Sequence, residues 1–400
     1  MMWKSVFISE NLRGQSSGRV FSWIRKGAEY AIRMLEQRNQ TFEAGDGGHA
    51  LPQTAPGLGQ PIDEEKARAL IDCCMEQGVN YYDTAYIYHG GHSETFLGRA
   101  LSCYDRERFY IADKFNVQAN PDAKAQFEEE MARLAMEYID FYLLHGVTDL
   151  TMTAYESSGC IPYFREQKRL GRIRYFGFSF HGTTDCLRKM LEMGDWDFVQ
   201  IQLNYYDWFQ GAAKEQYEIL RERHIPIMVM EPVHGGMLAN LPEEGMDLLP
   251  KGNLSPAAWA LRFAMDLPGV AVVLSGMSDL AHVRENLETA SMAPGLSREE
   301  LSALEEISAL LRKKVAVPCT GCRYCCDDCP QELDIPSLLS AYNDYRDDAA
   351  ALGDRAMAVW RLLRLKALPE QKQPGACTAH CPQMLEIPEY MKEMAEQLRQ

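Results

Sequence analysis

Short apolar segments recur at intervals of roughly 25 to 45 residues from residue 79 to residue 275, with amphipathic helical patterns between them. Seven of these segments are predicted as strands: Val79–Asp83, Arg108–Lys114, Ile139–His145, Ile173–Ser179, Phe198–Leu203, Ile225–Glu231 and Val270–Ser275. Helices are expected at 122–138 and 255–265, and another at 63–77 precedes the first strand. Several strands are nearly continuous apolar runs, which is typical of parallel strands buried on both faces.

Seven strands with helical crossovers favour an α/β fold of the (β/α)8 TIM-barrel type in which the first strand is missing from the sequence as written. The alternative is an open doubly wound sheet. That alternative is less favoured because nothing in the sequence matches its glycine-rich dinucleotide fingerprint.

Polar side chains stand where the first four predicted strands end. Asp83, Lys114, His145 and Ser179 are separated successively by 31, 31 and 34 residues, about one βα unit each. A barrel enzyme places its chemistry at the carboxyl ends of its strands. The four positions are therefore expected to converge on one pocket.

The motifs around these positions resemble those of the aldo/keto reductase family. Residues 80–88 (Asn-Tyr-Tyr-Asp-Thr-Ala-Tyr-Ile-Tyr), with Ser93-Glu94 and Leu97-Gly98 after them, are similar to the family signature. Further similar segments are Asp113-Lys114, residues 140–145, Gly177-Phe-Ser179 and residues 232–238. The resemblance covers residues 61 to 290 and implies reduction of an aldehyde, ketone or quinone by NADPH or NADH.

The resemblance also implies a catalytic tetrad of Asp83, Tyr88, Lys114 and His145. Hydride attack on a carbonyl carbon requires a proton for the oxygen, and a phenol with a pKa of about 10 is a poor donor unless a cation lies beside it. Lys114 would supply that cation, Asp83 would hold Lys114, and His145 would orient the carbonyl oxygen.

Cofactor contacts are assigned from the same resemblance. The expected residues are Ser179, Gln200, Asn204 and Met230 for the nicotinamide end, and Ser275, Glu285 and Asn286 for the adenosine end. Met230 stands where the family has a stacking tyrosine. Gly276 and His282 stand where NADP-selective relatives carry cations, and Arg284 is the one cation nearby, so the choice between NADP and NAD stays open.

The C-terminal part is rich in cysteine: seven of the twelve cysteines lie between Cys319 and Cys381. Residues 319–330 follow the spacing C-x₂-C-x₂-C-x₃-C-P of bacterial ferredoxins. The tail resembles the helical, ferredoxin-like domain attached to one branch of aldo/keto reductases. A zinc site is the alternative.

The second cysteine run is incomplete, because Gln371 and Pro374 replace its first two cysteines. Ferredoxin logic gives one complete ligand set and therefore one [4Fe–4S] cluster rather than two. That set is Cys319, Cys322, Cys325 and Cys381. Cys329 and Cys377 remain as a pair of thiols or a disulfide, or Cys329 replaces Cys381 as the fourth ligand, and Cys326 is an extra cysteine.

Residues 1–60 do not match the start of the family. Relatives begin with a strand close to Leu-Gly-Met-Gly-Gly-Met-Arg, whereas residues 40–52 show no strand periodicity. Codons for this stretch, read one base later, can encode that strand, so we hypothesise a displaced reading frame that ends between Pro56 and Ile62. A divergent helical extension is the alternative. The expected organisation is an anomalous segment (1–60), a reductase barrel (61–312) and an iron–sulfur domain (313–400).

The remaining features limit the partners. The net charge is −16 without a basic block, so nucleic acid is not expected. No apolar run approaches a membrane span and no signal peptide is evident, so we expect a cytoplasmic protein. A small carbonyl compound is the expected substrate, and an electron-transfer protein is a candidate partner. A nicotinamide-binding redox sensor with little turnover is the alternative function.

Overall fold

The computed structural model describes residues 62–292, 295–321, 323–327, 329, 333–347, 376–379, 381, 383 and 385–397. The N-terminal segment with its proposed displaced frame, and Cys322 of the predicted ligand set, lie outside these residues.

The centre of the structure is a seven-stranded parallel sheet. Its strands are β1 (Tyr81–Asp83), β2 (Tyr110–Phe115), β3 (Ile139–Val147), β4 (Ile173–Phe180), β5 (Phe198–Gln202), β6 (Ile227–Met230) and β7 (Val270–Val273). Each strand pairs in parallel with the next one along the chain. A doubly wound sheet would change direction in its strand order, so this consecutive order excludes that alternative. In the described part of the chain β1 and β7 do not pair with each other, which leaves a parallel, barrel-like sheet of seven strands.

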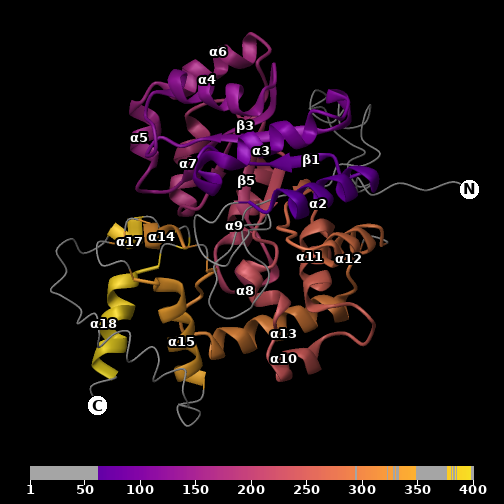
Figure 1. The fold of residues 1–400 in the computed structure, drawn as a ribbon. Helices are drawn as coiled ribbons and strands as arrows, with labels where there is room; N and C mark the ends of the chain where they lie inside the picture. Colours follow the sequence, from indigo (N-terminus) through magenta and orange to yellow (C-terminus); the bar gives the residue numbers. More distant parts are fainter. Residues whose placement is uncertain are drawn as a thin grey trace, which may run out of the picture.

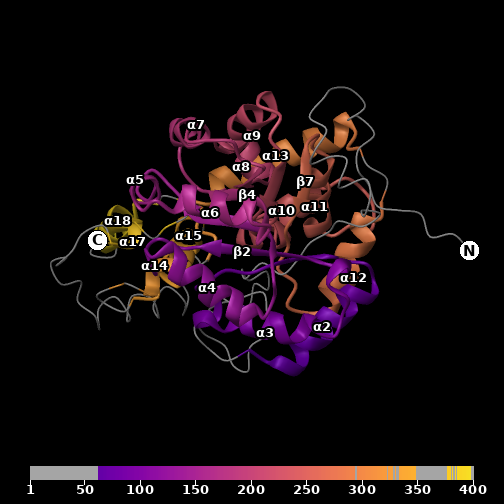
Figure 2. The same cartoon turned by 90° about the horizontal axis from the view of Figure 1, so that it is seen from above.

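Helices surround the sheet, as the two perpendicular views show (Figures 1 and 2). In the barrel they are α2 (Glu64–Glu76), α3 (His92–Leu101), α4 (Ala123–Leu134), α5 (Met152–Ser157), α6 (Cys160–Arg169), α7 (Thr184–Glu192), α8 (Tyr205–Gln210), α9 (Ala213–Glu222), α10 (Glu243–Leu248), α11 (Pro256–Asp266), α12 (Leu280–Ala290) and α13 (Arg298–Lys314). Short 3₁₀ helices lie at η2 (Tyr88–Gly91), η3 (Arg106–Arg108) and η4 (His234–Ala239). Local sequence explains several helix starts: Asp63, Asp122 and Ser255 cap α2, α4 and α11 through their side-chain oxygens.

The two faces of the sheet carry different cores. One cluster fills the interior of the curved sheet and contains Tyr81, Ala112, Leu143, Phe198, Met228, Met230, Val272 and Leu274. A larger cluster lies between the strands and the helices. Because side chains alternate along a strand, Asp83, Lys114 and His145 face the same side as the interior residues two positions before them. The predicted site residues therefore share the interior face at the carboxyl ends of their strands.

The cysteine-rich part is helical in its described residues. It contains α14 (Tyr324–Asp327), α15 (Ile335–Asp347), α17 (Ala376–Ala379) and α18 (Ile387–Gln397). These helices share a small core that includes Val317, Leu339, Tyr342, Ile387 and Met391. We refer to residues 317–397 as the cysteine module. Within the described ranges, no helix combines the length and the apolar character that crossing a bilayer would require.

Candidate active site

A buried ion pair lies at the carboxyl ends of β1 and β2. Lys114 Nζ donates to a carboxylate oxygen of Asp83, and both side chains are almost fully buried. Lys114 Nζ also donates to the backbone oxygen of Thr84 at 2.8 Å and to the hydroxyl of Tyr88 at 3.3 Å. Three oxygens thus fix the ammonium group, and one of them belongs to the Tyr88 hydroxyl, which is expected to donate the proton. A neighbouring cation favours the ionised form of a phenol and so eases proton donation.

Tyr88 also lies against His145. Their ring centroids are 5.5 Å apart at an interplanar angle of 82°. The backbone oxygen of His145 accepts a hydrogen bond from the Tyr155 hydroxyl, which fixes the end of β3. The structure therefore brings together all four residues of the predicted tetrad. Thr84 and Tyr155, which support them, were not predicted, because a backbone acceptor and a helix residue carry no sequence signal of this role.

Ser179 and Gln200 are neighbours across β4 and β5, where they are paired in register. Ser179 Oγ accepts from the backbone N–H of Gly146 at 2.7 Å. Gln200 Nε2 lies 3.5 Å from the sulfur of Met230. Among the described residues the buried Gln200 Oε1 has no hydrogen-bond partner. A buried amide oxygen without a partner is costly, so this atom suits a bound ligand that offers an N–H group, such as a carboxamide.

The other predicted cofactor residues fall into two places. Asn286 Nδ2 donates to Ser275 Oγ at 3.0 Å, and Glu285 precedes Asn286 on the same helix, α12, so these three residues lie near one another beyond β7. Asn204 is elsewhere: its side chain accepts from the backbone N–H of Asp207 and caps α8.

The six cysteines of the module that the structure describes gather in one cluster. Cys325 and Cys381 are buried in its core, and Cys319, Cys326, Cys329 and Cys377 pack against that core. Backbone N–H groups point at two of the sulfur atoms, Gly321 N–H at Cys319 (3.4 Å) and Leu333 N–H at Cys329 (3.5 Å). No disulfide occurs among the cysteines that the structure describes.

The thiols influence one another. A hydrogen bond with Cys325 lowers the pKa of the Cys326 thiol. Burial raises the pKa of the Cys377 thiol, and the nearby Cys329 contributes to that rise. Sulfur atoms with N–H donors in an apolar core, drawn from both cysteine runs, are a suitable environment for thiolates that bind a soft metal centre.

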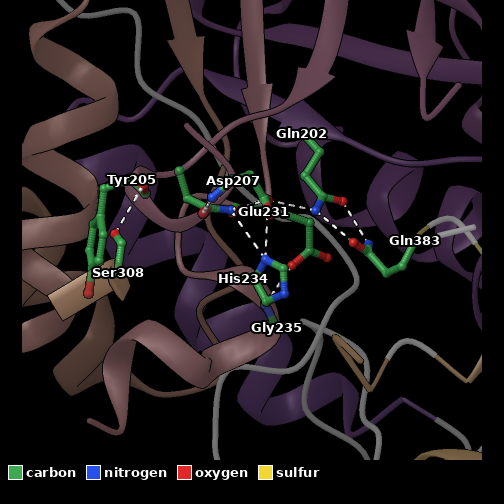
Figure 3. Close-up of polar contacts among 9 residues, drawn as sticks. Gln202, Tyr205, Asp207, Glu231, His234, Gly235, Ser308 and Gln383 are labelled. Atoms are coloured by element: carbon green, nitrogen blue, oxygen red, sulfur yellow. Dashed lines mark hydrogen bonds and ion pairs between the residues drawn. The ribbon is translucent and has the colours of Figure 1, made fainter. Parts of the chain in front are cut away.

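A polar junction connects the module to the barrel (Figure 3). Asp207 Oδ2 accepts from Gln202 Nε2 (2.8 Å) and Asn204 Nδ2 (2.7 Å), and it forms an ion pair with His234 Nδ1 (3.1 Å). Gln202 also exchanges hydrogen bonds with Gln383 of the module. We refer to Gln202, Asp207, His234 and Gln383 as the junction.

The loop that carries His234 approaches the module closely. Glu231, His234, Gly235 and Gly236 all have positive φ angles, and the Gly235 N–H donates to Glu231 Oε2 at 2.6 Å. A Cβ atom at Gly235 would lie 2.1 Å from the backbone oxygen of Thr320, so only glycine fits there. Thr320 follows Cys319 directly, and the module therefore sits against the loop after β6.

A parallel barrel-like sheet with buried Lys114, Asp83 and Tyr88 and a half-buried His145 at its strand ends defines an enzyme of the (β/α) barrel class. The model of the aldo/keto reductase family matches residues 47–309. The chain belongs to the aldo/keto reductase family and is an NAD(P)-dependent oxidoreductase.

The chain is also similar to known proteins along most of their length. The chain is 25% identical over 283 residues to the uncharacterized oxidoreductase YqkF of Bacillus subtilis, which covers 61% of this chain and 88% of the relative. The holo form of aldo-keto reductase AKR11C1 from Bacillus halodurans superimposes with a TM-score of 0.54 at 24% identity, covering 68% of this chain and 96% of that one. An aldo-keto reductase from Klebsiella pneumoniae in complex with NADPH superimposes with a TM-score of 0.53 at 19% identity, covering 68% of this chain and 94% of that one.

Proposed function

We propose that the protein reduces a small carbonyl compound (an aldehyde, ketone or quinone) with NADPH, and that Tyr88 is the proton donor. The observation that carries this proposal is the contact between Tyr88 and a buried lysine that Asp83 holds in place. A hydroxyl beside a fixed ammonium group, at the carboxyl ends of barrel strands, is suited to protonate a carbonyl oxygen.

Each residue then has one role. Tyr88 gives its proton to the substrate oxygen, Lys114 stabilises the phenolate left behind, and Asp83 pairs with Lys114 and orients it. His145, at the edge of the Tyr88 ring, hydrogen-bonds the carbonyl oxygen and orients it. The bound nicotinamide supplies the hydride.

The cofactor contacts follow from the two predicted sites. Gln200 Oε1, with Ser179 beside it, would accept from the carboxamide N–H₂ group, and Met230 would contact the nicotinamide in place of an aromatic side chain. Ser275, Glu285 and Asn286 would hold the adenosine end. The preference for NADPH rests on the NADPH complex of the Klebsiella pneumoniae neighbour.

The test is anaerobic oxidation of NADPH and NADH with a panel of simple aldehydes and quinones, comparing the wild-type protein with Tyr88→Phe. We expect Tyr88→Phe to lose at least about 100-fold in kcat/KM, the range for a general acid. Tyr217→Phe is the matched control, because its hydroxyl binds the backbone of Pro268 away from the site. Full turnover by Tyr88→Phe would refute the proposal. An inactive wild type that still binds NADPH would favour the redox-sensor function.

We further propose that the cysteine module holds one [4Fe–4S] cluster, with Cys319, Cys322, Cys325 and Cys381 as ligands. The burial of Cys325 and Cys381 in one core supports this set, because it joins the first cysteine run to the second. When bound, the cluster would exchange single electrons or hold the module together. Cys329 and Cys377 are left as neighbouring thiols.

Metal analysis of anaerobically purified protein tests this proposal. About four iron and four sulfide per chain, lost in Cys381→Ser but retained in Cys377→Ser, would support the ligand set. If Cys381→Ser keeps its iron and sulfide while Cys329→Ser loses them, Cys329 is the fourth ligand. One zinc per chain without iron would refute the cluster.

A further inference from the structure

Tyr88 lies in a backbone turn that needs support from outside. It begins η2, and the next three residues, His89, Gly90 and Gly91, all have positive φ angles (47°, 62° and 86°). Left-handed backbone is costly for a residue with a side chain, such as His89, and it persists only where neighbouring groups hold it. The position of the Tyr88 hydroxyl therefore depends on contacts that fix the ends of this turn.

Arg133 of α4 contacts both ends of the turn. Its Nη1 donates to the backbone oxygen of Tyr86 at 3.3 Å, and its guanidinium lies 4.6 Å from the Tyr86 ring centroid. On the other side of Tyr88, a Cβ atom added to Gly91 would lie 3.1 to 3.2 Å from the Arg133 guanidinium. The guanidinium group thus lies beside both ends of the turn, at Tyr86 and at Gly91.

Glu94 holds Arg133 in this place. Glu94 Oε2 accepts from Arg133 Nη1 at 2.7 Å, and the Glu94 side chain is fully buried. Glu94 lies in the first turn of α3, where a negative charge is favoured by the helix dipole. The second partner of Arg133, Glu129, is more exposed than Glu94 and contributes less.

A second carboxyl group links Glu94 to the strand of Lys114. Oxygens of Glu94, Asp113 and Glu130 all lie within 4.8 Å of one another, and all three side chains are buried. Asp113 Oδ1 accepts from the backbone N–H of Lys114 at 2.8 Å. The contacts therefore run from the turn of Tyr88 through Arg133, Glu94 and Asp113 to the backbone of Lys114.

Three buried carboxyl groups lie together in this cluster, and burial and mutual repulsion both disfavour their ionised forms. The groups that face it are Glu94, Asp113, Glu130, Glu129, Arg133, Tyr86, Tyr142 and, from the other side of β2, Lys114. Burial raises the pKa of Asp113 and Glu130 well above their usual values, and the charge of Glu94 adds to the rise at Asp113. Burial raises the pKa of Glu94 too, but the hydrogen bond and charge of Arg133 oppose that rise, so Glu94 is the carboxyl group of the three that this ion pair favours as a carboxylate.

We propose that Glu94 and Arg133 are positioning residues for the carbonyl reduction, which hold the Tyr88 hydroxyl beside Lys114 Nζ. This inference rests on the proposed function of Tyr88. The pair contacts neither the substrate nor the cofactor site, and it acts through the turn of residues 86–91. Misplacing a reacting group by about 1 Å can slow a reaction by up to about 100-fold.

The experiment compares Glu94→Gln and Arg133→Lys with the wild type in the full-length protein. We expect kcat to fall about 10- to 100-fold while the Kd for NADPH, measured by fluorescence titration, changes less than about twofold. The limb of the pH–rate profile that disappears in Tyr88→Phe should move. Glu128→Gln is the control: it breaks the exposed ion pair of α4 with Arg172 and should leave kcat and the profile unchanged.

A double variant separates positioning from general stability. If Glu94 acts through Tyr88, Tyr88→Phe with Glu94→Gln should be no slower than Tyr88→Phe alone. The inference is overturned if Glu94→Gln and Arg133→Lys lower only the melting temperature, or if the double variant is slower by the product of the single effects. Should Glu94→Gln not fold, Arg133→Lys, which keeps the charge, decides alone. Full activity of Tyr88→Phe would overturn both the proton-donor role of Tyr88 and the positioning role of Glu94 and Arg133. If Tyr88→Phe is inactive while Glu94→Gln and Arg133→Lys are fully active, only the positioning role is overturned.

Discussion

Gln202 and Gln383, 181 positions apart in the chain, hydrogen-bond to each other through both ends of their amide groups. Each Nε2 donates to the Oε1 of the partner at 2.7 Å. Gln383 follows Cys381 by two residues, and Gln202 follows Gln200 by two residues on β5. This amide pair therefore connects a predicted cluster ligand to the strand that carries a predicted nicotinamide contact.

The first prediction concerns the strength of this connection. We expect Gln202→Ala and Gln383→Ala each to destabilise the protein, and the double variant to lose less than the sum of the two. Two neutral hydrogen bonds predict a coupling energy of about 1 to 2 kcal/mol. Urea unfolding of the four proteins measures it. Additive losses would show that the two side chains do not interact in solution.

The second prediction concerns the buried pair of Lys114 and Asp83. Lys114→Met leaves the Asp83 carboxylate buried without its cation, which should lower the free energy of unfolding by about 3 to 5 kcal/mol. Adding Asp83→Asn should restore much of the stability but none of the activity. The exposed pair of Arg169 and Glu166 is the control, and Arg169→Met should cost less than about 1 kcal/mol. A small loss in Lys114→Met would mean that water reaches Asp83.

The third prediction is the pH dependence caused by Glu130. Burial raises its folded-state pKa well above the unfolded value of about 4.3, and Tyr142 donates a hydrogen bond to it. Above pH 4.3 the unfolded chain loses this proton while the folded protein keeps it. Stability therefore falls as pH rises, by at most about 1.4 kcal/mol per pH unit for this group.

The variant Glu130→Gln removes this loss, because a neutral amide replaces a neutral acid. We expect Glu130→Gln to gain stability relative to the wild type between pH 4.5 and pH 7 in urea unfolding. Glu128→Gln serves as the control, since the exposed ion pair with Arg172 lowers the pKa of Glu128 instead. A constant difference between Glu130→Gln and the wild type across this range would show that Glu130 is ionised in the folded protein.

Much of the barrel and of its site was predictable from local sequence. The seven strands lie within three residues of their predicted ends, because buried parallel strands leave continuous apolar runs. The proximity of the four predicted tetrad residues could be expected, because Asp83, Lys114 and His145 lie at the ends of consecutive strands and Tyr88 lies in a motif between them. The helix predicted at 122–138 instead ends at Leu134, since Ala135 adopts a left-handed conformation.

Other parts of the site depend on contacts that leave no local pattern. Asp113 and Glu130 look like ordinary polar residues in a strand and a helix, and only the packing of α3 and α4 on β2 buries them together with Glu94. The junction joins positions far apart in the sequence. Asn204, assigned to the cofactor by resemblance, caps α8, and the pattern of an asparagine three residues before an aspartate was the signal for that role.

The last prediction concerns the ion pair of His234 and Asp207. Burial opposes both charges, yet the interaction with Asp207 raises the pKa of His234, and the interaction with His234 lowers the pKa of Asp207. The contribution of His234 to stability is complete below its unfolded pKa of about 6.5 and is lost as pH rises through the raised folded value. The contribution of Asp207 to stability is present above its unfolded pKa of about 3.9 and is lost as pH falls through its lowered folded-state pKa. The pair therefore stabilises the protein most between these limits.

His234→Gln tests this window. We expect it to cost roughly 2 kcal/mol at pH 6 and clearly less at pH 9, as measured by urea unfolding, because the wild-type histidine has then lost its charge. His224→Asn is the control. His224 is exposed with a φ of 56°, which asparagine tolerates, so the change in the free energy of unfolding should be small and independent of pH. His234 binds Asp207 and belongs to the loop that packs against Thr320, so its loss should also make the module easier to cleave by proteases. Equal costs of His234→Gln at pH 6 and pH 9 would show that the folded protein holds this histidine neutral.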